Sequence, residues 1–177
     1  MAEQYPRGLC CHEAGHAIVA YSFNLHVESV CVRFEEAKGW YGCAKTSSPE
    51  YLSISDQVVN SAAGKAAEEY FNCPAHEGAW LHDFGEISSL LNRSGLPDDE
   101  LWPRIGEGIE RARDILKKYR NEALMLTNRL AECGRIDGVE FTRLMNARRM
   151  QQSGSSIDQA AERRDQFVEG GRLGGRK

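Results

Sequence analysis

The sequence has no long apolar run and no excess of positive charge, and each absence excludes a class of protein. A helix that crosses a bilayer needs about 20 consecutive apolar residues, so we expect no membrane segment. The formal net charge of −4 argues against a nucleic-acid-binding protein, which normally presents a basic face. The first residues, MAEQYPRGLC, lack the charged and then apolar layout of a signal peptide. We therefore expect a cytoplasmic protein without a nucleic-acid partner.

Two cofactor-binding patterns are also missing. The six cysteines form no Cys-x-x-Cys pair, so we expect no structural zinc cluster built from them. We expect no signal peptide, and 177 residues suffice for a hydrophobic core without disulfide bonds. We therefore expect the cysteines to be reduced thiols. The phosphate-binding pattern Gly-x-x-x-x-Gly-Lys-Ser/Thr is absent, so we expect no ATP-driven motor within this chain.

The composition, with 41% hydrophobic and 27% charged residues, is typical of one globular domain. Hydrophobic periodicity predicts a mainly α-helical fold with a small β-sheet or hairpin. The expected strands are 28–34 and 40–46, and the expected helices are 6–22, 53–71, 82–92, 99–132 (a helical hairpin broken near 119–122) and 139–148. We expect residues 1–150 to form the domain and residues 151–177 to form a polar, Gly-rich, partly mobile tail with a helical patch at 157–167.

Two positions carry local structural signals. Ser53 is the expected N-cap of the helix 53–71, because Asp56 follows three residues later. Gly15 lies inside the helix 6–22, where glycine costs about 1 kcal/mol relative to alanine. Its presence indicates that a neighbouring segment approaches the helix closely at this point.

The first expected helix carries the pattern HExxH, within the string CHEAGHA. Four helical residues advance about 400°, so His12 and His16 project from one face, one turn apart. Two imidazoles spaced in this way can bind one zinc ion. Glu13 lies beside this face, where its carboxylate can hold the metal's water and act as general base. The pattern indicates a zinc peptidase, although an ordinary amphipathic helix can contain the same string.

A catalytic zinc ion needs a third protein ligand and an open fourth position. The candidates are the other histidines and the downstream acidic residues: His26, His76, His82, Glu68, Glu69, Asp83 and Glu86. Spacing alone does not choose among them. Asp83 also has an ordinary alternative role as a helix N-cap.

The order of several motifs resembles the peptidase domain of the FtsH-type AAA+ proteases. The sequence has HEAGHA, a strand, a second strand of small residues, the helical string AGKAAEE and, later, His82-Asp83. The family has HEAGHA, a helix similar to Gly-Gly-Arg-x-Ala-Glu-Glu, and Asn-Asp at the start of the next helix. The resemblance covers about residues 8–145 and implies a zincin-like HExxH metallopeptidase fold.

This resemblance implies a role for each matching residue of the motif. His12 and His16 resemble the family's histidine ligands to Zn²⁺, and Glu13 resembles its catalytic glutamate. Asp83 resembles the aspartate that completes the metal shell.

The helical string AGKAAEE both matches the family and departs from it. Glu68 and Glu69 match its Ala-Glu-Glu, and one of them could accept a hydrogen bond from a ligand histidine. The alternative is that both belong to a solvated helix face. The family's Gly-Gly-Arg is replaced by residues 63–65, Ala-Gly-Lys, and its asparagine before the aspartate is replaced by His82.

The second strand resembles the family's substrate-binding edge. An exposed strand edge holds an extended peptide through main-chain hydrogen bonds, without demanding a particular side-chain sequence. The alternative is that this strand only completes a hairpin over the core. The residues in question are Gly42, Cys43, Ala44 and Lys45.

Together these patterns predict a zinc-dependent metalloendopeptidase that acts on polypeptides without its own ATPase motor. A separate ATP-driven unfoldase and an oligomeric assembly are the partners that the resemblance suggests. One alternative is a cytosolic HExxH protease of the ImmA/IrrE type that cleaves a specific partner and uses Glu68 or Glu69 as third ligand. Another is a non-catalytic, peptidase-like binding module, which would have no need to retain Glu13.

Overall fold

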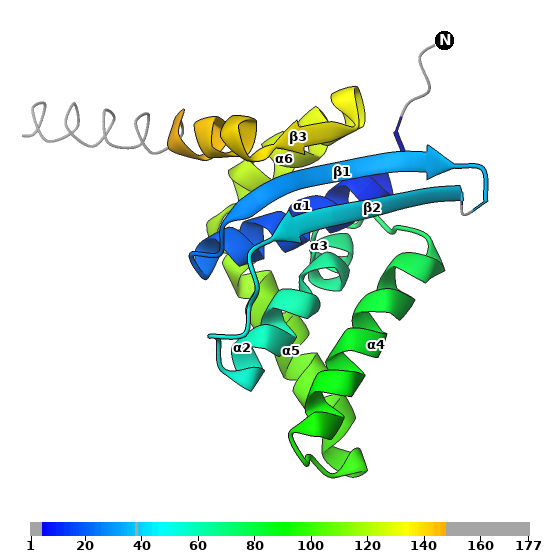
Figure 1. Cartoon of the computed structure of the whole chain (residues 1–177), viewed down its shortest axis with the longest axis vertical. Coiled ribbons are helices and arrows are strands. Elements are labelled where there is room, and N and C mark those ends of the chain that lie inside the picture. Colours follow the sequence, from blue (N-terminus) through cyan, green and yellow to red (C-terminus); the bar gives the residue numbers. More distant parts are fainter. Residues whose placement is uncertain (1–4, 38, 148–177) are drawn as a thin grey trace, which may run out of the picture. The chain divides into compact units, whose positions relative to one another are not determined.

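The computed structural model describes residues 5–37 and 39–147. These residues are mainly helical and include a three-stranded antiparallel sheet, which confirms the predicted fold class at this level (Figure 1). The predicted tail at 151–177, with its helical patch at 157–167, lies outside the described residues. The chain divides into two compact units after Phe141. Within the described part, no helix combines the length and hydrophobicity needed to cross a membrane.

Helix α1 (Arg7–Ser22) is the centre of the first unit. Most of its residues are buried, from Leu9 through Ala20, which is typical of a helix covered on every side. It contacts the sheet, α3 (Ala63–Phe71) and α6 (Arg120–Cys133). Polar side chains in the middle of α1 are therefore enclosed and need partners from other elements.

The sheet has the strand order β2-β1-β3, which leaves β2 at an edge. The strands are β1 (Val27–Glu35), β2 (Gly39–Thr46) and β3 (Arg135–Asp137); the first two were predicted and β3 was not. Val32 N–H donates to the Gly134 carbonyl beside β3 at 2.7 Å. Val32 is paired with Gly42, and backbone groups alternate in direction along a strand. The N–H and C=O groups of Gly42 and Ala44 therefore point away from β1, toward the open edge.

The predicted helix 53–71 is two helices, α2 (Ile54–Ser61) and α3. Ser53 caps α2 as predicted, since its side chain accepts a hydrogen bond from Asp56 N–H at 3.1 Å. The predicted helical region 99–132 is present as α5 (Asp98–Lys118) and α6, with the break at Tyr119 as predicted. It is not a hairpin, because α5 packs on α2 and α3 whereas α6 packs on α1.

The helix predicted at 82–92 is longer and begins earlier, as α4 (Glu77–Arg93). Asp83 therefore lies inside α4 rather than at its start, and both the N-cap alternative and the placement of His82-Asp83 at a helix start are wrong. Helix α4 begins without a side-chain cap, so no residue in the sequence marks its start.

Small residues allow α1 and α3 to pack closely, as Gly15 predicted. A Cβ atom at Gly15 would lie 2.6 Å from Ala67 Cβ and 2.7 Å from the Ala63 carbonyl oxygen. The backbone of α3 cannot retreat without moving the buried alanines around it. The glycine thus sets the separation of the two helices.

We expect Gly15→Ala to lower the free energy of unfolding by about 2 kcal/mol, because overpacking against backbone outweighs the gain in helix propensity. Chemical denaturation in the presence of a chelator measures this without a contribution from bound metal. Gly106→Ala is the matched control, since Gly106 is helical with open space around it, and it should stabilise the protein by up to about 1 kcal/mol. Equal stability of Gly15→Ala and the parent protein would contradict the close packing.

Candidate metal centre

Three side-chain atoms from two helices converge in the middle of the first unit. Helix α1 supplies the Nε2 atoms of His12 and His16, and α4 supplies Oδ2 of Asp83. The two nitrogens lie 3.2 Å apart, and each lies 3.2 Å from the Asp83 oxygen. His12 and Asp83 are buried and His16 is partly buried. Among the described residues, these three form a group that could hold a metal ion.

The other nitrogen of each ring determines its tautomer. Nδ1 of His12 lies 2.7 Å from the Glu68 carboxylate, and Nδ1 of His16 lies 3.2 Å from the Asn60 carbonyl. Both partners only accept hydrogen bonds when Glu68 is ionised, so a neutral ring carries its hydrogen on Nδ1. Each Nε2 atom then directs a lone pair toward the Asp83 oxygen. Three acceptors that face one another need positive charge between them, which protons on the rings or a metal ion can supply.

The spacing of these atoms fits a metal ion of the size of zinc. Ligands at 2.0–2.1 Å from a tetrahedral zinc ion are separated by about 3.3 Å, close to the 3.2 Å observed. Two histidines and one carboxylate are also an ordinary donor set for catalytic zinc. The residues present therefore fit a zinc ion, although they do not by themselves identify the metal.

The electrostatics of the centre favour positive charge. Burial lowers the pKa of His12, but hydrogen bonds with Asp83 and Glu68 outweigh this and raise the pKa to about 9. Burial lowers the pKa of His16 as well, and the charge of Asp83 produces a net increase. Burial raises the pKa of Asp83, but the two histidines hold it well below its ordinary value. A divalent cation would supply the charge that these groups stabilise.

Glu13 is buried between α1 and β2, beside the two histidines. Burial raises the pKa of its carboxyl group, although His16 and His12 partly oppose the increase. The carboxylate also has a hydrogen bond with the backbone of Ala44. A Cβ atom at Gly42 would lie 2.3 Å from Glu13 Oε1. The edge strand thus passes directly over Glu13, and only glycine leaves room for its carboxylate.

Of the two adjacent glutamates on α3, the structure brings Glu68 to a histidine and Glu69 to the surface. Glu68 is buried, and its carboxylate contacts Nδ1 of His12. The converging atom of His12 is Nε2, so Glu68 lies on the other side of the ring from the three converging atoms. Glu69 forms ion pairs with Arg113 at 2.8 Å and with Lys65 at 3.6 Å. One of the two glutamates, Glu68, therefore accepts the expected hydrogen bond from a histidine, and Glu69 lies on the solvated face of the helix.

The remaining candidates for the third ligand lie elsewhere. His82 is 79% exposed and pairs with Glu86 at 3.4 Å. His76 Nε2 lies 3.1 Å from the Trp40 carbonyl. His26 is exposed at the start of the sheet. The Asn60 carbonyl was missed by the sequence analysis, because no side chain marks a backbone acceptor.

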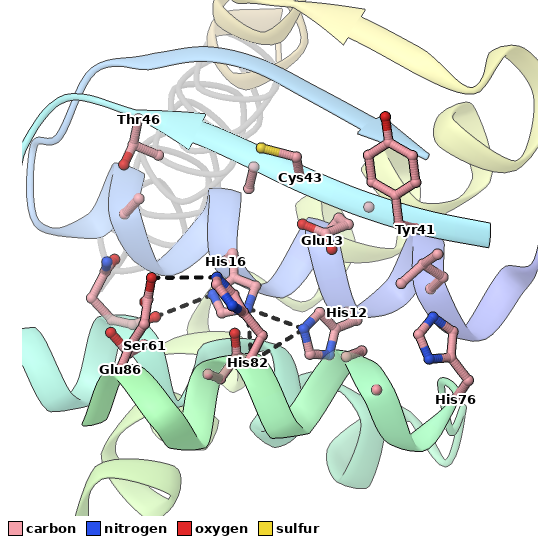
Figure 2. Close-up of a pocket in the computed structure, with 18 of the residues that line it drawn as sticks. His12, Glu13, His16, Tyr41, Cys43, Thr46, Ser61, His76, His82 and Glu86 are labelled. Atoms are coloured by element: carbon pink, nitrogen blue, oxygen red, sulfur yellow. Dashed lines mark hydrogen bonds and ion pairs between the residues drawn. The ribbon is translucent and has the colours of Figure 1, made fainter. Parts of the chain in front are cut away.

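The three converging atoms and Glu13 line an open cleft of about 550 Å³. Figure 2 shows β2 along one side of this cleft, α1 behind it and α4 opposite. Gly42, Cys43 and Ala44 of the predicted substrate strand line it. Lys45 does not: its side chain is exposed and pairs with Glu28 at 2.5 Å.

No family model matches the sequence, and no curated protein matches it either. What the centre can do therefore follows from its own residues.

We expect the purified protein to bind about one zinc ion per chain, and His12→Ala and Asp83→Ala to lose most of it, because two donors rarely hold zinc. Elemental analysis after dialysis measures the bound metal. His82→Ala is the matched control for Asp83→Ala, since this neighbouring side chain is exposed, and it should keep its zinc. Full zinc content in both ligand variants would refute the assignment.

Glu68→Ala should weaken zinc binding about 10- to 100-fold, because a histidine ligand loses the carboxylate that orients it. Competition with a chelator of known affinity provides the measurement. Glu69→Ala removes the neighbouring carboxylate, which has only surface contacts, and should change the affinity by less than about twofold. Similar losses in both variants would mean that Glu68 has no specific role at the centre.

Proposed function

We propose that this protein is a zinc-dependent metalloendopeptidase with a zincin-like active site of the FtsH peptidase type. The observation that carries the proposal is the buried carboxylate of Glu13 beside three converging donors in an open cleft. A binding module has no need of a buried acid next to a metal site. Burying such a group costs free energy, which a catalytic role explains.

When bound at this centre, a zinc ion would activate a water molecule and polarise the scissile carbonyl. Glu13 is placed to act as the general base and acid: its carboxylate would take a proton from the attacking water and give it to the departing amine. A carboxylate with a raised pKa is a stronger base than an ordinary glutamate, and burial shifts the pKa of Glu13 in this direction. Glu68 and the Asn60 carbonyl hold the two imidazoles in the tautomer that leaves Nε2 free.

The open edge of β2 is the proposed binding site for the substrate backbone. The outward C=O groups of Gly42 and Ala44 and the outward N–H of Gly42 can pair with one peptide strand, while the Ala44 N–H donates to Glu13. Gly42 and Ala44 are small enough for a second backbone to come close. Such binding selects an extended polypeptide rather than a folded one. The 177 residues of this sequence contain no phosphate-binding loop, so the proposed hydrolysis uses no ATP bound here, and unfolding of a folded substrate would need a motor outside them.

The alternative of an ImmA/IrrE-type protease with a glutamate ligand is less well supported. The Glu68 carboxylate contacts Nδ1 of His12 rather than Nε2. Glu69 forms ion pairs with Lys65 and Arg113. Asp83, by contrast, faces both Nε2 atoms.

We expect Glu13→Gln to retain zinc and to lose hydrolysis of an unstructured protein by about 10²- to 10⁴-fold, because an amide cannot accept the proton. Zinc content and cleavage rate are measured on the same preparation. Glu107→Gln, which changes an exposed carboxylate on α5, is the control and should cleave at the parent rate. Parent activity in Glu13→Gln would refute the mechanism, and loss of zinc would give Glu13 a structural role instead.

A further inference from the structure

The cleft at the metal centre continues into a second hollow of about 540 Å³. The two share four lining residues, Pro49, Ser61, His82 and Glu86. Beyond these residues the hollow follows α4 toward its C-terminal end, with α2 on its other side. We call this second hollow the α2–α4 groove. In Figure 2, Ser61, His82 and Glu86 lie on the side of the cleft that α2 and α4 form.

The lining of the α2–α4 groove is suited to a polypeptide backbone. Gly85 and Ser89 lie one turn apart on α4, and, apart from the adjacent residues and the nearby backbone of α4 itself, no described atom lies within 4 Å of the position that a Cβ at Gly85 would take. Gln57 of α2 lines the groove as well and can donate to or accept from main-chain groups. The floor is open and mixes these groups with the apolar side chains of Pro49, Leu81 and Leu90.

At its far end the groove reaches Arg93, in the last turn of α4. The Arg93 side chain is exposed and forms no ion pair with any residue that the structure describes. A guanidinium group without a partner is well placed to bind a carboxylate.

The length of the groove sets the length of chain that it accepts. Ten residues separate Asp83 from Arg93, which is about 15 Å along a helix. An extended peptide rises 3.2–3.4 Å per residue, so about four or five residues span this distance.

We propose that the α2–α4 groove binds the substrate polypeptide on one side of the scissile bond, over about four or five residues, and favours an acidic residue beside Arg93. This proposal rests on the proposed peptidase function and adds to it a substrate class: extended chains with an acidic residue at this distance from the cleavage point. The β2 edge aligns the chain at the metal, and the groove holds its continuation.

Binding can be tested without catalysis in zinc-loaded Glu13→Gln, by fluorescence anisotropy of labelled peptides. The probes are a four-residue peptide and seven-residue peptides that extend it by three residues toward either terminus, with Asp or Lys at the far end, so that this end lies five residues from the central peptide bond. We expect the Asp-ended extension in one direction to bind about tenfold more tightly than the four-residue peptide. Equal binding of all probes would overturn the proposal.

Two substitutions localise this gain. Ser89→Trp should fill the groove and reduce the affinity of the long peptide to that of the short one, while Asn92→Trp on the same helix, outside the lining, should not. Arg93→Glu should reverse the preference between Asp- and Lys-ended peptides, while Arg120→Glu on α6 should not. Unchanged binding in Ser89→Trp and Arg93→Glu, with normal zinc content, would place the chain elsewhere.

The outcomes also separate the two proposals. Glu13-dependent hydrolysis without any length dependence of binding would leave the peptidase function intact and remove the groove. Length-dependent binding that Ser89→Trp abolishes, without any hydrolysis by the parent protein, would support the groove and refute the peptidase.

Discussion

The convergence of His12, His16 and Asp83 is the constraint on which the arrangement of the first unit depends. Their facing atoms lie 3.2 Å apart, with Glu68 and the Asn60 carbonyl directly behind them. Groups that only accept hydrogen bonds are costly to bury together unless a cation joins them. Helices α1, α3 and α4 meet at this point, and so their relative positions are coupled to the charge that the centre holds.

The main chains of β2 and α3 lie directly against two side chains of the centre. A Cβ atom at Gly42 would strike Glu13, and one at Gly64 would lie 2.4 Å from the ring of His12. Strand β2 and helix α3 therefore touch the functional side chains with their main chains. A backbone wall is rigid and leaves the carboxylate and imidazole few alternative rotamers, which is how a site is pre-organised.

The sequence predicted elements better than boundaries. Helix α1, strands β1 and β2 and the break near Tyr119 follow from periodicity and appear where expected. The split of the helix 53–71 at Ala62 and the early start of α4 were not predicted. Helices α3 and α4 both begin without a side-chain cap, so no residue marks where they start. Strand β3 has three residues, too few for a periodic signal, and exists only because β1 offers it an edge.

For the candidate site, the sequence by itself determined the part that lies within one helix. His12, Glu13 and His16 are placed by the pitch of α1, since residues four apart share a face. The tertiary structure decided the rest. Asp83 meets the histidines, Glu68 rather than Glu69 turns inward, and the open edge of β2 lies over Glu13. Each of these contacts joins segments far apart in the chain, so it depends on how the helices and the sheet pack, which spacing along the sequence does not encode.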